Sequence, residues 1–158
     1  MTPSAVAPTP TNTKTPYTNW RPPLIGVSLF VPVDGDALLV AKTMGGIVLP
    51  VGGVREGQTV EHAAREVLPG GELPHLRRVF TDRRQMRRRA VVTHVLATAA
   101  MSQDETLPFA YRDPRGMLLI LTIREAISRM PPRTRSRVEL AALTLAGGTV
   151  RLPFPTPK

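Results

Sequence analysis

The residues best suited to chemistry lie in a segment with the sequence GGVREGQTVEHAAREVLPGGEL, from Gly52 to Leu73. A turn containing Gly52 and Gly53 leads into a short helical stretch that carries Arg65 and Glu66. Side chains at positions i, i+3 and i+4 of a helix share one face, so carboxylates at 66 and 70 would point together. Such a pair, with phosphate oxygens and waters, holds Mg²⁺. Position 70 is a glycine, so Glu66 lacks this partner.

The same segment resembles the signature of the Nudix hydrolase family, G-x5-E-x7-R-E-U-x-E-E-x-G-U, where U is aliphatic. Residues 48–50 and 52–53 resemble its usual lead-in, Gly57-Gln58-Thr59 its Gly-Glu-Ser/Thr turn, and residues 63–67 its helix core. The resemblance extends over residues 24–146. It implies an α+β fold, an α/β/α sandwich with a mixed β-sheet, and Mg²⁺-dependent cleavage of nucleoside diphosphate derivatives.

The departures from this signature fall where the metal would bind. Gln58 replaces the first glutamate, and six residues rather than seven separate it from the signature arginine. Pro69 and Gly70 replace the following pair of glutamates, and Glu72 stands in place of the late glycine. A lone Glu66 leaves only a weak Mg²⁺ site, since Mg²⁺ is held by one or two carboxylates plus phosphate and water. The resemblance therefore favours a divergent member in which hydrolysis is impaired.

Roles for single residues follow from the resemblance. Arg65 and Glu66 match the catalytic core, and Glu66 with Glu72 are the nearest Mg²⁺ ligands. Some family members recruit a further acidic residue from a late loop as base or ligand, and Glu105 is the candidate here; the other interpretation of Glu105 is a polar turn. Arg65 and Glu66 have a structural alternative as well, an ion pair that orients the loop.

Arginine dominates the net charge of +9. Seven arginines crowd one expected hairpin, at positions 77, 78, 83, 84, 87, 88 and 89. The planar guanidinium group suits phosphate because it forms bidentate hydrogen bonds, so Arg83 and Arg84, with Gly52 and Gly53, are the candidate ligand-binding residues. A nucleic acid is another partner for this hairpin, although aromatic residues for base stacking are scarce there. A solvated basic hairpin is the third interpretation.

Length and composition exclude several classes of protein and of site. A chain of 158 residues fits one domain. The absence of cysteine excludes disulfides, thiolate metal sites and a cysteine nucleophile, and fits a reducing cytoplasm. No apolar run reaches the roughly 18–20 residues that cross a bilayer, so we expect no membrane partner. Pro and Thr dominate residues 1–23, which predicts a flexible arm before a domain at 24–148 and a tail at 149–158.

The elements that must position these residues follow from the apolar pattern. We expect strands at residues 24–32, 37–42, 47–51, 76–81, 91–98 and 116–121, and a polar loop at 102–108. We expect helices at 60–68, from Thr122 to before Pro131, and at 135–146. Thr59 and Thr122 are expected N-caps, and Glu125 completes a capping box with Thr122.

Three functions remain after the sequence is examined. The leading hypothesis is a divergent Nudix-fold protein that binds a nucleotide-like or phosphorylated small molecule, or a protein partner, in a regulatory or accessory role, as a pseudoenzyme. The second is an active hydrolase in which Glu66 works with Mg²⁺. The third is a basic nucleic-acid-binding protein.

Overall fold

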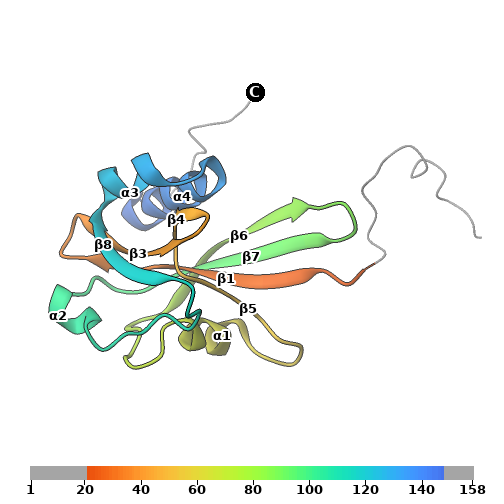
Figure 1. Cartoon of the computed structure of the whole chain (residues 1–158), viewed down its shortest axis with the longest axis horizontal. Helices are drawn as coiled ribbons and strands as arrows, with labels where there is room; N and C mark the ends of the chain where they lie inside the picture. The colour runs from red at the N-terminus through yellow and green to blue at the C-terminus, as the bar shows by residue number, and fades with distance from the viewer. Residues whose placement is uncertain (1–20, 148–158) are drawn as a thin grey trace, which may run out of the picture.

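Strands form in this chain where aliphatic and β-branched residues run together, and helices form where such residues recur at helical spacing. The computed structural model describes residues 21–147. Figure 1 shows three layers, with strands between helix α1 (Val60–Val67) on one side and helices α3 (Ile123–Arg129) and α4 (Pro132–Gly147) on the other. The expected α+β class and α/β/α sandwich are confirmed.

The first sheet is mixed in direction, as the sequence predicts. Its strand order is β5 (Val51–Gly53), β1 (Leu24–Phe30), β7 (Ala90–Ala97) and β6 (Arg77–Gln85). β1 runs parallel to β7 and antiparallel to β5, while β6 runs antiparallel to β7. Val27 and Leu29 of β1 are fully buried. The short glycine strand β5 therefore lies at one edge of the sheet and the arginine-rich β6 at the other.

A second, antiparallel sheet completes the middle layer. Its central strand β3 (Ala37–Thr43) pairs along one side with β8 (Met117–Thr122). Along its other side it pairs with β2 (Pro32–Val33) and β4 (Gly46–Val48). The expected mixed sheet is thus one of two sheets, and direction is mixed only in the first.

Two hydrophobic cores separate the layers. Val60, Ala63, Ala64 and Val67 of α1 pack into a cluster with buried residues of β1. On the opposite side, Val138 and Ala141 of α4 belong to a second cluster, with residues from β3, β7 and α3. Burial of these apolar faces holds α1 against the first sheet, and this arrangement fixes the helix beside β5.

The expected strand at residues 47–51 is wrong as a single element. The chain forms β4 and β5 in two different sheets, with Leu49 and Pro50 between them. Proline has no N–H to donate to a ladder. Its carbonyl oxygen accepts from the N–H of Leu29 at 2.9 Å. The proline therefore marks the point where the chain passes from one sheet to the other.

Further boundaries differ from expectation. The strand expected at residues 24–32 is divided into β1 and β2, which lie in different sheets, and β6 ends at Gln85 rather than at residue 81. The loop predicted at 102–108 contains a single helical turn, α2 (Gln103–Thr106). The last helix begins at Pro132 rather than at residue 135. Proline is tolerated in the first turn because the N–H groups there have no partner within the helix.

The domain boundaries stay predictions. Residues 1–20 of the expected arm and all of the expected tail, 149–158, lie outside the described residues. Residues 21–23 carry no strand or helix. Within residues 21–147, no helix is both long and apolar enough to cross a membrane.

Candidate functional site

A cavity of about 450 Å³ lies between β5, α1 and residues 112–113. Gly52 and Gly53 of β5 form part of its wall, and Val67 contributes from α1. Arg55 and Arg112 add two cationic side chains from the flanking segments. Two guanidinium groups beside an apolar wall make this cavity suitable for an anionic ligand with an apolar part.

Glycine at position 52 allows the close approach of β5 to α1. A Cβ atom there would lie 2.7 Å from Cγ2 of Val67, closer than real Cβ contacts. Val67 is itself buried, with 2% of its surface exposed. A larger residue at 52 would push the helix away, so this glycine sets the distance between the helix and the floor of the cavity.

Helix α1 starts as the sequence predicts. The Thr59 hydroxyl accepts a hydrogen bond from the N–H of His62 at 3.0 Å, which caps the first turn. Glu61 lies in that turn and pairs with Arg78 of β6, Nε to Oε2, at 3.0 Å. The hydrogen bond from Arg78 lowers the pKa of Glu61. This pair fastens the outer side of the helix to the sheet.

Glu66 is surrounded by basic side chains. Arg55 donates from Nη1 to Oε1 at 3.0 Å and from Nη2 to Oε2 at 3.3 Å. Arg112 donates from Nη1 to Oε1 at 2.7 Å. His62, one turn earlier on α1, lies with Nε2 3.2 Å from Oε2. We call these four residues the Glu66 cluster.

The cluster changes the acidity of its carboxyl group. The side chains of Arg55, Gln58 and Arg112 hold the pKa of Glu66 at about 2. The buried Nε2 atom of Gln58 has no partner within ordinary hydrogen-bond geometry among the described residues. Its Oε1 atom accepts from the N–H of Arg55 at 2.9 Å. Gln58 therefore also ties down the turn that carries Arg55.

The segment bearing Arg112 lies against the end of α1. The N–H of Ala110 donates to the Pro69 carbonyl at 2.9 Å, and the N–H of Arg112 donates to the Val67 carbonyl at 3.0 Å. Gly70 adopts a φ of 101°, a conformation that favours glycine. A Cβ atom at position 70 would collide with the Pro108 carbonyl oxygen. The missing side chain at 70 thus makes room for this segment.

Tyr111 secures the other wall of the cavity. The backbone N–H of Val51 donates to the Tyr111 hydroxyl at 3.2 Å, and that hydroxyl donates to the Val51 carbonyl at 3.4 Å. Burial raises the pKa of Tyr111, so its O–H stays protonated as a donor. Its neighbour Arg112 is therefore held between two anchors, one on β5 and one on α1.

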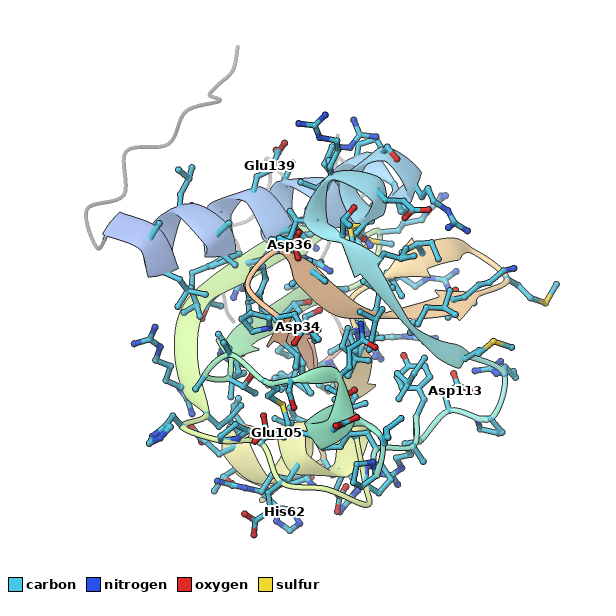
Figure 2. The ribbon with its side chains drawn as sticks, turned by 90° about the vertical axis from the view of Figure 1, so that its left-hand side faces the viewer. Asp34, Asp36, His62, Glu105, Asp113 and Glu139 are labelled. Atoms are coloured by element: carbon cyan, nitrogen blue, oxygen red, sulfur yellow. The ribbon has the colours of Figure 1, made fainter. Side chains whose placement is uncertain are left out.

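The predicted catalytic residues do not converge. Arg65 is exposed and adjacent to Glu66, and neighbouring helix positions do not face each other. Glu105 Oε1 accepts from the N–H of Ser102 at 2.8 Å, and the N–H of Glu105 donates to the Ser102 hydroxyl at 3.2 Å. This reciprocal pair is a capping box for α2. In Figure 2, Glu105 on α2 and Asp113 of the cavity lie well apart.

The predicted ligand-binding residues fall in two places. Gly52 and Gly53 line the cavity. Arg83 and Arg84 lie exposed on β6, at the opposite edge of the sheet from β5. The structure therefore separates these arginines from the glycines. Arg55 and Arg112, which sequence reasoning did not select, are the arginines that reach the cavity.

The donor set of the Glu66 cluster does not fit Mg²⁺, the metal implied by the fold's usual chemistry. Two oxygens of Glu66 already accept from guanidinium groups, and cations beside the carboxylate repel a metal ion. Glu72 is exposed beyond the end of α1. Among residues 21–147, no three His, Cys, Asp or Glu side chains gather as a metal site.

Partial signals for the missed residues exist in the sequence. Arg55 comes two residues after Gly53, within the segment already singled out. Arg112 lies 46 positions after Glu66, and only the fold brings the two together. Pro69 and Gly70 mark where a segment can approach the helix, but nothing in the sequence says which segment does so.

Comparison with known proteins places the fold. No family model matches the sequence, and no curated protein matches it. Among solved structures, the NUDIX domain of Shewanella oneidensis NrtR, complexed with ADP ribose, superposes with a TM-score of 0.65 at 15% identity, covering 80% of this chain and 91% of that one. The MutT protein from Methanosarcina mazei Go1 superposes with a TM-score of 0.62 at 13% identity, covering 80% of this chain and 98% of that one.

A third similar structure has higher sequence identity. The MutT NUDIX hydrolase from Burkholderia pseudomallei is 22% identical with a TM-score of 0.55, covering 74% of this chain and 96% of that one. Identities this low establish the fold alone. The layers, the strand order and these superpositions agree with the resemblance of residues 52–73, and the chain therefore has the Nudix fold.

Proposed function

We propose that this chain is a divergent Nudix-fold protein that binds a nucleotide-like or otherwise phosphorylated small molecule between β5, α1 and residues 112–113. The observation that carries the proposal is the position of Arg55 and Arg112 on the wall of a cavity of about 450 Å³. Ligand sites for small molecules commonly measure about 300–1,000 Å³. Two guanidinium groups would hold the phosphate, and the apolar wall at Val54 and Val67 would take a ring or ribose face.

The likeness to other Nudix-fold proteins supports this ligand class. The NrtR domain was solved with ADP ribose, a molecule that combines a diphosphate with a nucleoside. The lining of the present cavity has the elements such a ligand needs, cationic groups and aliphatic surface. ADP-ribose is therefore a rational first probe, together with simple nucleoside diphosphates.

We favour ligand binding over hydrolysis because the two candidate acidic residues form hydrogen bonds within the protein. Glu66 is bonded to Arg55 and Arg112, and Glu105 caps α2. Both carboxylates are therefore engaged in contacts within the protein. An accessory or regulatory role in the cytoplasm, in which a ligand is sensed and not consumed, is consistent with this arrangement and with a chain free of cysteine.

The test is an NMR titration of the ¹⁵N-labelled protein with ADP-ribose and with GDP. We expect the amide signals of Gly52, Gly53 and Asp113 to shift with saturation, because these residues line the cavity. The amides of Gly35 and Gly45, in turns that do not line the cavity, serve as internal controls and should remain in place. Unchanged spectra at millimolar ligand would refute the proposal.

A parallel assay addresses the hydrolase alternative. The protein is incubated with ADP-ribose, nucleoside triphosphates and Mg²⁺ or Mn²⁺, and phosphate-containing products are quantified. We expect no turnover above that of a Glu66→Gln variant. Turnover at about 1–1,000 per second, the ordinary range for enzymes, that disappears in this variant would establish hydrolysis and reject the binding role.

A further inference from the structure

The end of α1 carries a backbone contact where a metal-binding helix would carry a carboxylate. Position 70 lies one helical turn after Glu66, but its φ of 101° takes it out of the helix. The Pro108 carbonyl oxygen fills the space of a Cβ atom there. The Pro69–Gly70 sequence therefore does more than remove a ligand, since it provides a docking position for the segment that follows α2.

That docked segment places one guanidinium group on Glu66. Its backbone is held by hydrogen bonds to the carbonyls of Pro69 and Val67, at 2.9 and 3.0 Å. Arg112 leaves this segment and reaches Glu66 with an Nη1–Oε1 distance of 2.7 Å. A cation is thus positioned beside the carboxylate by main-chain contacts, independently of any bound metal.

A second guanidinium group approaches from the other side. Arg55 forms a two-pronged contact with Glu66, with nitrogen–oxygen distances of 3.0 and 3.3 Å. This planar fork matches a phosphate group as well as it matches a carboxylate. Arg55 and Arg112 are each 59% exposed, so both are accessible to a ligand that enters the cavity.

The charges of the cluster are unbalanced. Two guanidinium groups share a single carboxylate, which leaves one positive charge over, and His62 adds a further nitrogen at 3.2 Å. Asp113, the acidic residue that lines the cavity, is paired with Arg115 at 3.1 Å. A doubly charged phosphate would satisfy both arginines better than one carboxylate does. Release of Glu66 is inexpensive because exposed ion pairs contribute little stability.

We propose that Arg55 and Arg112 form a metal-independent clamp for the phosphate or diphosphate of the ligand, and that Glu66 occupies this clamp in the free protein as an internal anion that the ligand displaces. This inference rests on the proposed function and adds the chemistry of recognition to it. The guanidinium groups take the part that a metal ion plays in bridging the diphosphate, and Glu66 competes for them.

The experiment measures the affinity for inorganic pyrophosphate by calorimetry in EDTA. Glu66→Gln removes the competing charge, so we expect affinity to rise about threefold or more. The double variant Arg55→Gln with Arg112→Gln should lose at least about tenfold. Arg55→Lys keeps the charge but loses the planar guanidinium group, so its affinity for pyrophosphate should lie between those of the wild type and the double variant.

A matched control pair joins α1 to β6. Glu61 and Arg78 form an ion pair of similar length, 3.0 Å, outside the cavity wall. Glu61→Gln changes the net charge by the same amount as Glu66→Gln, and Arg78→Gln removes one of the two positive charges that the double variant removes. We expect both to leave the pyrophosphate affinity within about twofold of the wild type, since a distant exposed charge is largely screened. Circular dichroism verifies that every variant is folded.

The possible outcomes distinguish the arginine clamp from the proposed ligand-binding function of the cavity. Binding that needs Mg²⁺, or that disappears in Glu66→Gln, overturns the inference and favours a metal site. If ADP-ribose shifts the amide signals of Gly52 and Gly53 in the double arginine variant with the same affinity as in the wild type, the clamp is overturned. That result leaves the proposed function standing. Pyrophosphate binding in EDTA that strengthens in Glu66→Gln supports the clamp, even if no nucleotide shifts the cavity amides.

Discussion

Arg112 and Glu66 lie 46 positions apart in the sequence, yet the Nη1 and Oε1 atoms of their side chains are 2.7 Å apart. Their contact joins the segment before β8 to the last turn of α1, beside the cavity that Arg112 lines. With Arg55 on the other side, it converts a helix that resembles a metal-binding element into one whose carboxylate is held by arginines.

Acid should remove the contribution of the Glu66 cluster to stability. The side chains of Arg55, Gln58 and Arg112 lower the pKa of Glu66 to about 2, against an ordinary value of 4.5. A carboxyl group with a lowered folded-state pKa stabilises the fold above pH 4.5, and this contribution disappears as pH falls through about 2.

Urea titrations of the wild type and Glu66→Gln at pH 7, 4.5 and 2.5 measure this effect. The difference in unfolding free energy should be largest at pH 7 and should shrink between pH 4.5 and 2.5. The other carboxyl groups titrate in both proteins, so their effects cancel in the difference between the two unfolding free energies. A difference that stays constant over this range would show that the charge of Glu66 does not stabilise the fold.

Position 70 should not accept a side chain. Gly70→Ala combines an unfavourable φ of 101° with a collision at the Pro108 carbonyl. We expect a loss of about 2–4 kcal/mol in unfolding free energy, of which about 1–2 kcal/mol is backbone strain. Gly46→Ala is the matched control, because φ there is 109° and no atom lies within 4 Å of the added Cβ. Equal losses in urea titrations of the two variants would contradict the collision.

The attachment of α4 should depend on Asp82. This β6 residue accepts from Arg137 Nε at 2.9 Å, and both side chains are largely buried, at 23% and 17% exposure. Arg137→Met keeps the aliphatic stem but leaves the carboxylate without its nearest donor, so we expect a loss of about 1–2 kcal/mol.

The exposed pair Arg129–Glu125, 3.5 Å apart, provides the comparison. Arg129→Met should cost less than about 0.5 kcal/mol, as exposed helix pairs do. Thermal and urea unfolding give both values. The prediction is contradicted if the two substitutions have the same effect.

Glu105 should matter for stability and not for ligand binding. Its reciprocal hydrogen bonds with Ser102 cap α2. Glu105→Ala should cost about 0.5–2 kcal/mol, and Glu105→Gln should cost less because glutamine can keep the capping box. Pyrophosphate affinity should stay at the wild-type value in both. A drop in affinity in Glu105→Gln, with stability retained, would restore Glu105 as a functional residue.

The arginines of β6 should be independent of the cavity. Arg83 and Arg84 lie at the edge of the sheet opposite β5. We expect the double variant Arg83→Gln with Arg84→Gln to bind pyrophosphate as the wild type does. Binding to duplex DNA, measured by fluorescence anisotropy from 50 to 200 mM salt, tests the nucleic-acid alternative. Tight, strongly salt-dependent binding that weakens in this variant would support a second role for the hairpin.

Local signals predicted the fold well. The cap at Thr59 and the apolar positions of residues 60–67 define α1 correctly, because a capped amphipathic helix is specified by neighbours in the sequence. The strand boundaries at 47–51 failed because Pro50 redirects the chain between two sheets, and the choice of sheet depends on long-range pairing.

The site was only half predictable. Gly52, Gly53 and Glu66 could be chosen because they lie in one recognisable segment. Arg112 could not, because its place is set by backbone hydrogen bonds to Val67 and by packing in three dimensions. Arg83 and Arg84 were favoured by local charge density, which does not show which edge of a sheet a strand occupies.

The contact between Gly70 and Pro108 also limits how this sequence can change. A glutamate introduced at position 70 alone would collide with the Pro108 carbonyl, and the segment cannot withdraw without breaking the backbone bonds of Ala110 and Arg112. Stepwise routes from this chain toward a pair of helical carboxylates therefore pass through less stable intermediates. A helical carboxylate pair can therefore replace the arginine contacts of Glu66 only if several positions change together.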